Sequence, residues 1–130
     1  MNQLKTTSKL YNFNSKNNDL KDNLVEEIRN AIENGAEYFV VGDISERTSG
    51  FVRGSLMSNL IVNLQELTNN AKNGIRIALT NTYEDLDFYS YVLEKVPGVY
   101  FHFDEEHAVK YSKNSLDEWN EFLSKTNISN

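Results

Sequence analysis

The sequence predicts a small, three-layer, Rossmann-like α/β domain with a mostly parallel four-stranded sheet. Strand-like and helix-like apolar patterns alternate along the chain, which is typical of parallel strands joined by right-handed helical crossovers. The YFVV run at residues 38–41 is apolar at every position, as expected for a strand that is covered on both faces. The first strand is short, so an α+β domain with an antiparallel edge strand is the alternative.

Apolar spacing predicts each element in the first half of the chain. Residues 9–13 are expected to form a short strand. Apolar residues then recur at helical spacing from 20 to 32, ahead of a left-handed helix stop at Gly35. After the YFVV strand a long connection covers 43–55, and helix resumes by about residue 52 or 55 and continues to Ala71.

The second half of the chain repeats this alternation, and its helices have clear start and stop signals. Alternating apolar residues predict a strand at 75–79, and the sequence TYED predicts a capping-box-like helix start at Thr82. Pro97 ends that helix, and VYFHF at 99–103 predicts the fourth strand. A capping box at Ser115 opens the last helix.

The length of 130 residues fits one folded domain, which we expect at 19–125, with a basic polar arm at 1–18 and a polar tail at 126–130. The arm could contribute an edge strand. No apolar run is long enough to span a membrane, and the N-terminus lacks the apolar stretch of a signal peptide, so the protein is expected to be cytoplasmic. The absence of cysteine excludes disulfides, thiolate metal sites and cysteine nucleophiles.

The formal net charge of −6 is unevenly distributed. Residues 1–18 contain three lysines and no acid, so the remainder of the chain carries −9. Nucleic-acid binding needs a clustered basic surface, which this sequence lacks, and a basic protein partner is the better expectation. The carboxylates expected to bind it follow the fourth strand or begin the last helix: Asp104, Glu105, Glu106, Asp117 and Glu118.

These observations favour a small acidic interaction protein without enzymatic activity, of the bacterial or phage accessory, inhibitor or immunity type. That comparison rests on size and charge alone. Aromatic side chains would supply binding energy if they were exposed. The candidates are Tyr83, Phe88, Tyr89, Tyr91 and Trp119.

The alternative function is binding of a nucleotide or another phosphate ligand at the carboxyl ends of the strands. Parallel strands and the helix N-termini that follow them converge there, and the 43–55 connection contains residue types that bind phosphate. It lacks the lysine and spacing of a Walker A motif. The candidate ligand-binding residues are Asp43, Ser45, Arg47, Thr48, Ser49, Arg53 and Asn81.

The sequence gives weaker signals for other kinds of site. His102, Asp104 and His107 have a spacing that could hold a metal, but too few ligands accompany them, so no metal, cofactor or catalytic residue is expected. Glu66 is the only charged residue in the helical segment 54–71. That helix is therefore either central in the core or covered by a partner, and an exposed stripe of Leu and Ile there would indicate a homo-oligomer.

Overall fold

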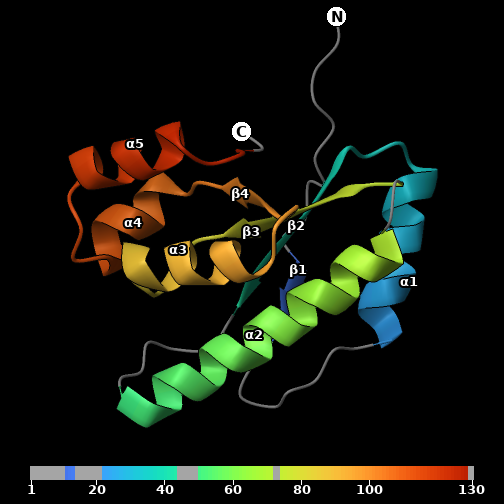
Figure 1. Cartoon of the computed structure of the whole chain (residues 1–130). Coiled ribbons are helices and arrows are strands. Elements are labelled where there is room, and N and C mark those ends of the chain that lie inside the picture. The colour runs from blue at the N-terminus through green and yellow to red at the C-terminus, as the bar shows by residue number, and fades with distance from the viewer. Residues whose placement is uncertain (1–10, 14–21, 44–49, 72–73, 129–130) are drawn as a thin grey trace, which may run out of the picture.

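The computed structural model describes residues 11–13, 22–43, 50–71 and 74–128, and within these ranges it describes the backbone alone at 11–13, 22–25, 43 and 50–52. Strands and helices alternate up to β4, and two further helices follow (Figure 1). The mixed α/β class is confirmed. The elements are β1 Tyr11–Phe13, α1 Asp22–Glu33, β2 Tyr38–Asp43, α2 Gly50–Ala71, β3 Arg76–Thr80, α3 Leu86–Lys95, β4 Tyr100–His102, α4 Glu105–Tyr111 and α5 Leu116–Ser124.

The described strands pair in parallel, in the order in which they occur in the chain. Phe39 of β2 lies opposite Ile77 of β3, and Leu79 of β3 lies opposite Phe101 of β4. The antiparallel edge strand that we considered as an alternative is therefore wrong for these strands. Because each crossover steps to the next strand in the same direction, right-handed connections place all the crossover helices on one face of the sheet.

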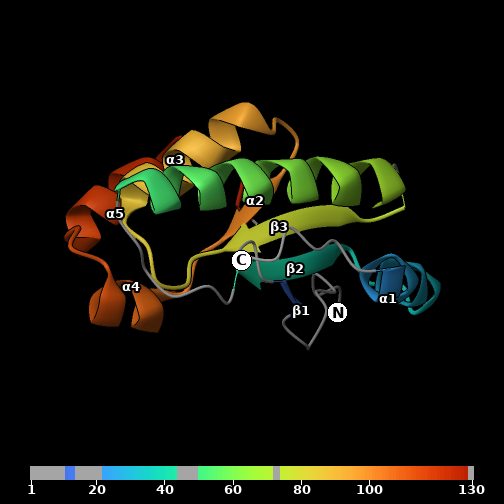
Figure 2. The ribbon, with the colours of Figure 1, turned by 90° about the horizontal axis from the view of Figure 1, so that it is seen from below.

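The core shows this one-sided arrangement. Phe39, Ile77 and Phe101 on one face of the sheet pack in a single cluster with buried residues of all five helices. Figure 2 shows α2 and α3 lying over this face. The opposite face has its own small cluster around Tyr38 and Ala78, to which no described helix contributes. The described residues thus form two layers rather than the predicted three, because the strand order never reverses.

Several predicted boundaries are confirmed and two are corrected. Gly35 adopts the left-handed conformation with φ 77°, and Ser115 forms the predicted capping box. The helix start predicted at Thr82 is wrong, because α3 begins four residues later, after its N-cap Asp85. The helix α4 was not predicted. Its seven residues are too few for a clear apolar repeat, and its acidic start resembles a solvated turn.

The long helix α2 buries one face only. Its leucines Leu56, Leu60, Leu64 and Leu67 are all at most 4% exposed, so they belong to the core and do not form an exposed stripe. Asn63 lies on the same buried face at 1% exposure, and its amide nitrogen has no hydrogen-bond partner among the described residues. A buried donor without an acceptor costs about 1–3 kcal/mol of stability.

Replacing Asn63 by the similarly shaped Leu should therefore stabilise the fold. We expect Asn63→Leu to raise the free energy of unfolding by about 1–2 kcal/mol, because an unpaired amide is exchanged for apolar surface inside the leucine layer. Urea unfolding followed by circular dichroism measures the change. Asn69→Leu on the exposed face of the same helix is the control and should leave stability nearly unchanged. A destabilised Asn63→Leu protein would contradict the prediction.

Candidate functional site

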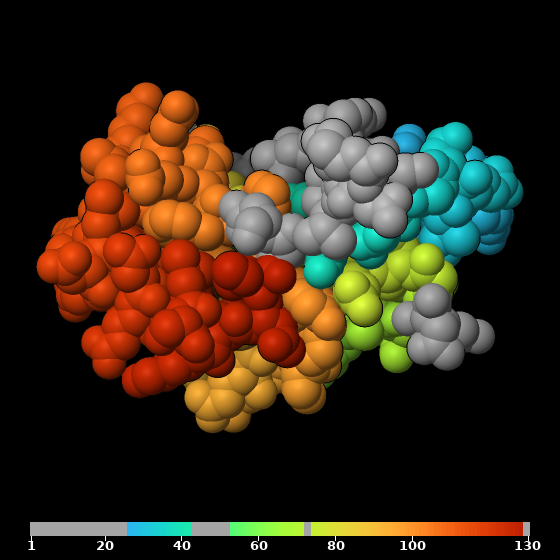
Figure 3. Space-filling model, turned by 90° about the horizontal axis from the view of Figure 1, so that it is seen from above, coloured from blue at the N-terminus to red at the C-terminus, as the bar shows by residue number. Residues whose placement is uncertain are grey.

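The negative charge of the chain is concentrated at one end of the molecule. Residues 82–128 contain ten acids and four lysines, which equals the whole net charge of −6, whereas acids and bases balance in residues 1–81. Figure 3 shows that α4 and α5 occupy one end of the molecule and α1 the other. Among the described residues, seven exposed carboxylates lie on α3, α4 and α5: Asp87, Glu94, Glu105, Glu106, Asp117, Glu118 and Glu121. We call these three helices the acidic end.

The turn that carries α4 is fixed by the side chain of Asn81, which follows β3. The amide of Asn81 donates a hydrogen bond to the carbonyl of Asp104 over 2.8 Å and accepts one from the N–H of Asp104 over 2.7 Å. Asn81 is 1% exposed and Asp104 is half-buried, so the Asn81 end of both bonds lies in the protein interior. This pair of bonds sets the direction in which the chain leaves β4.

Asp104 then caps α4. Its carboxylate accepts hydrogen bonds from the backbone N–H of His107 over 3.1 Å and from Nδ1 of the same residue over 2.8 Å. Burial acts to raise the pKa of Asp104, but the hydrogen bonds from His107 outweigh it, and the pKa lies below its ordinary value of 3.8. The ring of His107 packs against Tyr83 and Tyr111. Asp104 is thus held in place by its own helix.

The five predicted partner-binding carboxylates divide into two groups. Asp104 and Glu118 have structural roles, since Glu118 completes the capping box with Ser115, whose backbone N–H is the main cause of its lowered pKa. Glu105, Glu106 and Asp117 are exposed, and their carboxylates form no hydrogen bond or ion pair with any described residue. These three carboxylates are available to a partner.

Exposed apolar side chains lie beside them, at positions that sequence patterns did not distinguish. Val109 of α4 is 66% exposed and Leu116 of α5 is 39% exposed. Apolar periodicity separates exposed from buried positions only when a helix is long, and α4 has seven residues.

Most of the predicted aromatic anchors are not on the surface. Phe88, Tyr89 and Trp119 are buried in the core, and Tyr83 is half-buried. Tyr91 on α3 is exposed. Of the five, Tyr91 alone is exposed, and the ammonium group of Lys95 lies over its ring at 5.3 Å from the centroid.

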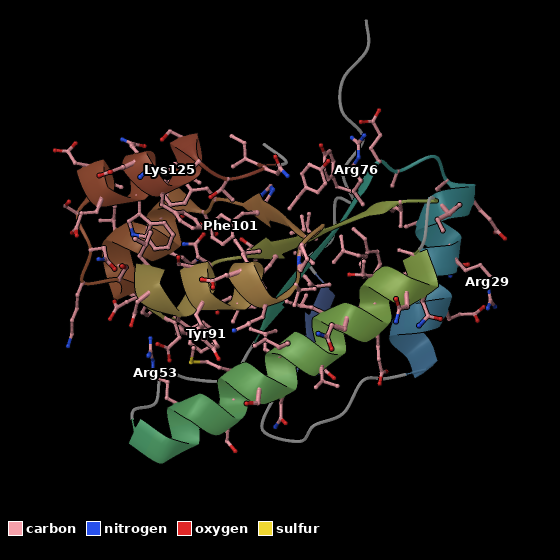
Figure 4. The ribbon with its side chains drawn as sticks, viewed as in Figure 1. Arg29, Arg53, Arg76, Tyr91, Phe101 and Lys125 are labelled. Carbon is pink, nitrogen blue, oxygen red and sulfur yellow. The ribbon has the colours of Figure 1, made fainter. Side chains whose placement is uncertain are left out.

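The connection between β3 and α3 links the acidic end to the rest of the fold. The hydroxyl of the buried Tyr89 accepts hydrogen bonds from the N–H groups of Thr82 and Glu84, which explains why helix does not begin at Thr82. Glu84 is 7% exposed and binds Arg53 of α2 over 3.0 Å. A second ion pair joins Arg53 to Asp87 over 3.0 Å, and Figure 4 shows Arg53 between α2 and α3.

The predicted phosphate-binding residues are only partly described. Arg53 of α2 is ion-paired with Glu84 and Asp87, and the amide of Asn81, just after β3, is occupied by Asp104. Ser45, Arg47, Thr48 and Ser49 lie outside the described residues, as does the side chain of Asp43. Ligands in open parallel sheets bind where the strand order reverses, and this order does not reverse. The phosphate site stays a prediction.

The described residues form neither a metal-binding cluster nor a membrane-spanning helix. His102 is on β4, and Asp104 and His107 are in contact, yet the described residues contain no group of three potential ligands that could hold a metal. In the described ranges, no helix has the length and hydrophobicity needed to cross a membrane.

Comparison with known proteins gives no relative. No protein-family model, no curated protein and no solved structure matches this chain. Functional inference therefore rests on the geometry and charge of the acidic end.

Removing the Asn81 amide should destabilise the whole acidic end. In Asn81→Ala, the N–H of Asp104 loses its partner, whereas its C=O keeps the N–H of Ala108, so we expect the free energy of unfolding to decrease by about 1–3 kcal/mol. Urea unfolding measures the loss. Asn127→Ala, at an exposed position, is the control. Stability unchanged in Asn81→Ala would show that the two bonds do not hold this turn.

His102 should make the fold sensitive to acid. Its partial burial lowers its pKa below 6.5, although the nearby Asp104 carboxylate opposes the shift. The folded protein then binds this proton more weakly than the unfolded chain, so the free energy of unfolding falls as the pH drops below about 6.5. The Asp104 contribution is lost only below about pH 3.8, outside this window. Urea unfolding at about pH 7.5 and about pH 5.5 should show a smaller difference for His102→Gln than for the wild type. An equal change in the free energy of unfolding for His102→Gln and the wild type would contradict the prediction.

Proposed function

We propose that this chain is a cytoplasmic, acidic protein-binding domain without enzymatic activity, of the kind found among small inhibitors and immunity proteins. The observation that carries the proposal is the set of exposed, unpaired carboxylates Glu105, Glu106 and Asp117, on the end that holds the whole net charge. The partner is a protein with a basic surface.

The electrostatics of the acidic end support this function. Seven exposed carboxylates on three adjacent helices produce a negative potential that attracts a basic surface and orients it before contact. Four lysines lie among them, so the field is not uniform and the partner can be selected by its charge pattern. Such attraction weakens as salt screens it.

Some of these exposed carboxylates stabilise helix starts, and the others are the groups that we assign to the partner. Acids in the first turn of a helix are stabilised by the helix dipole, and α4 and α5 both begin with two such acids. One carboxylate per helix start already has a capping role: Asp104 accepts the N–H of His107 in α4, and Glu118 accepts the N–H of Ser115 in the capping box of α5. The other acids lie next to exposed Val109 and Leu116, which gives the surface apolar contacts inside a charged rim.

Charge reversal tests the proposal. Immobilised wild-type protein should capture a partner from a lysate of its own source, and salt should release it. Glu105→Lys combined with Glu106→Lys should abolish that capture. The control is Glu33→Lys combined with Glu37→Lys, which changes the net charge equally but lies at the end of α1 and before β2.

We expect the control variant at Glu33 and Glu37 to keep the partner and the variant at Glu105 and Glu106 to lose it. If both variants keep the partner, the acidic end is not the binding surface. If both lose it, the binding reflects net charge alone, without a defined site.

A further inference from the structure

A glycine lies near the start of α2 at a position where the described structure does not require one. Glycine destabilises a helix relative to other residues, because it loses more backbone freedom on folding. The described glycines with positive φ are Gly35 and Gly98, so Gly54 is not in the left-handed region. A Cβ atom added at Gly54 would meet nothing within 4 Å. Neither backbone geometry nor packing among the described residues therefore accounts for this glycine.

Gly54 lines a hollow between α2 and α3. The hollow has a volume of about 520 Å³, within the usual range of ligand pockets. Its other lining residues are Ser55, Met57 and Ser58 of α2 and Tyr91 of α3. Figure 4 shows Tyr91 on the side of α3 that is nearest to α2. Because glycine has no side chain, the wall at Gly54 is the helix backbone itself, which keeps the hollow open.

Ion pairs hold the two walls of the hollow together. Arg53 of α2 binds Glu84 and Asp87, each over 3.0 Å. These contacts tie the first turns of α2 to the start of α3, and Tyr91 lies one turn after Asp87. The walls are thus positioned before anything binds, which reduces the cost of ordering them on binding.

The lining favours an uncharged aromatic ring. No lining residue is charged, so an ammonium or guanidinium group that entered would lose water without gaining a carboxylate. The ring of Tyr91 can pack edge-on or offset against another ring, and the Met57 sulfur can contact a ring edge. The hydroxyl groups of Ser55 and Ser58 can bond to a polar atom on that ring. The ammonium group of Lys95 lies over the Tyr91 ring, but Lys95 does not line the hollow.

We propose that the hollow receives the side chain of a tyrosine on the basic protein that the acidic end binds. This inference rests on the proposed function. The exposed carboxylates of Asp87 and Glu94 lie one turn before and one turn after Tyr91, on the same face of α3. A basic surface attracted by these carboxylates brings its neighbouring side chains over the hollow. An aromatic anchor in a pocket with a polar rim is the usual anatomy of a specific interface.

Titration with p-cresol, which has the ring and hydroxyl of a tyrosine side chain, tests the hollow directly. In NMR spectra of the full isotope-labelled chain, the amide signals of Gly54, Ser55, Ser58 and Tyr91 should shift, with a dissociation constant in the millimolar range. Methylcyclohexanol, its saturated counterpart, should bind several-fold more weakly, and ethylguanidinium at least about tenfold more weakly. If p-cresol leaves these signals unchanged, or if either other probe binds as tightly, the proposal is overturned.

Filling the hollow should abolish this binding. Gly54→Leu places a side chain in the hollow and should weaken p-cresol binding at least about tenfold. Asn69→Leu places the same side chain at an exposed position further along α2 and should leave p-cresol binding unchanged. Both substitutions introduce a residue of higher helix propensity, and circular dichroism verifies folding. A Gly54→Leu protein that binds p-cresol like the wild type would overturn the proposal.

The capture experiment then connects the hollow to the partner. Gly54→Leu should lose the partner that the wild type and Asn69→Leu both capture. If Gly54→Leu keeps the partner, the hollow is not a docking point and the proposal is overturned. If Gly54→Leu loses the partner while the Lys variant at Glu105 and Glu106 keeps it, the proposed role of the acidic end fails, whereas the assignment of the hollow stands.

Discussion

Two hydrogen bonds from one buried amide determine how the second half of this molecule is arranged. Asn81 bonds to both backbone groups of Asp104, so a buried side chain joins the end of β3 to the exit from β4. The same connection continues to the α4–α5 loop, since Asn114 accepts a hydrogen bond from the N–H of Leu86 and Asp85 accepts one from Lys113. The helices of the acidic end are therefore oriented from β3, and its charges are presented by a rigid support.

Local patterns predicted the strands and every helix except α4, but could not predict their arrangement in space. Apolar spacing and glycine stops such as Gly35 depend on neighbours in the chain, and these predictions succeed. Strand order depends on pairing between segments far apart, so neither the one-sided sheet nor the contact of Arg53 with Glu84 could be read from the sequence. The start of α3 was misplaced for a different reason: a side-chain hydrogen bond outweighs the capping pattern, because the hydroxyl of Tyr89 accepts the N–H groups of Thr82 and Glu84 and keeps these residues out of the helix.

The candidate site shows the same division. Its carboxylates were predicted because acids that follow strands or begin helices are visible in the sequence. The sequence did not show which of these carboxylates are free, because the capping roles of Asp104 and Glu118 depend on geometry.

The last described residues, Asn127 and Ile128, pair with β4 at the edge of the sheet. The N–H of Phe101 donates a hydrogen bond to the carbonyl of Asn127 over 2.8 Å, and Ile128 forms a parallel bridge with Phe101. An uncovered edge strand invites pairing with other chains, and here the C-terminal segment occupies that position on β4. Loss of Asn127 and Ile128 would therefore leave the N–H of Phe101 without this acceptor and uncover the outer edge of β4 for pairing with another chain.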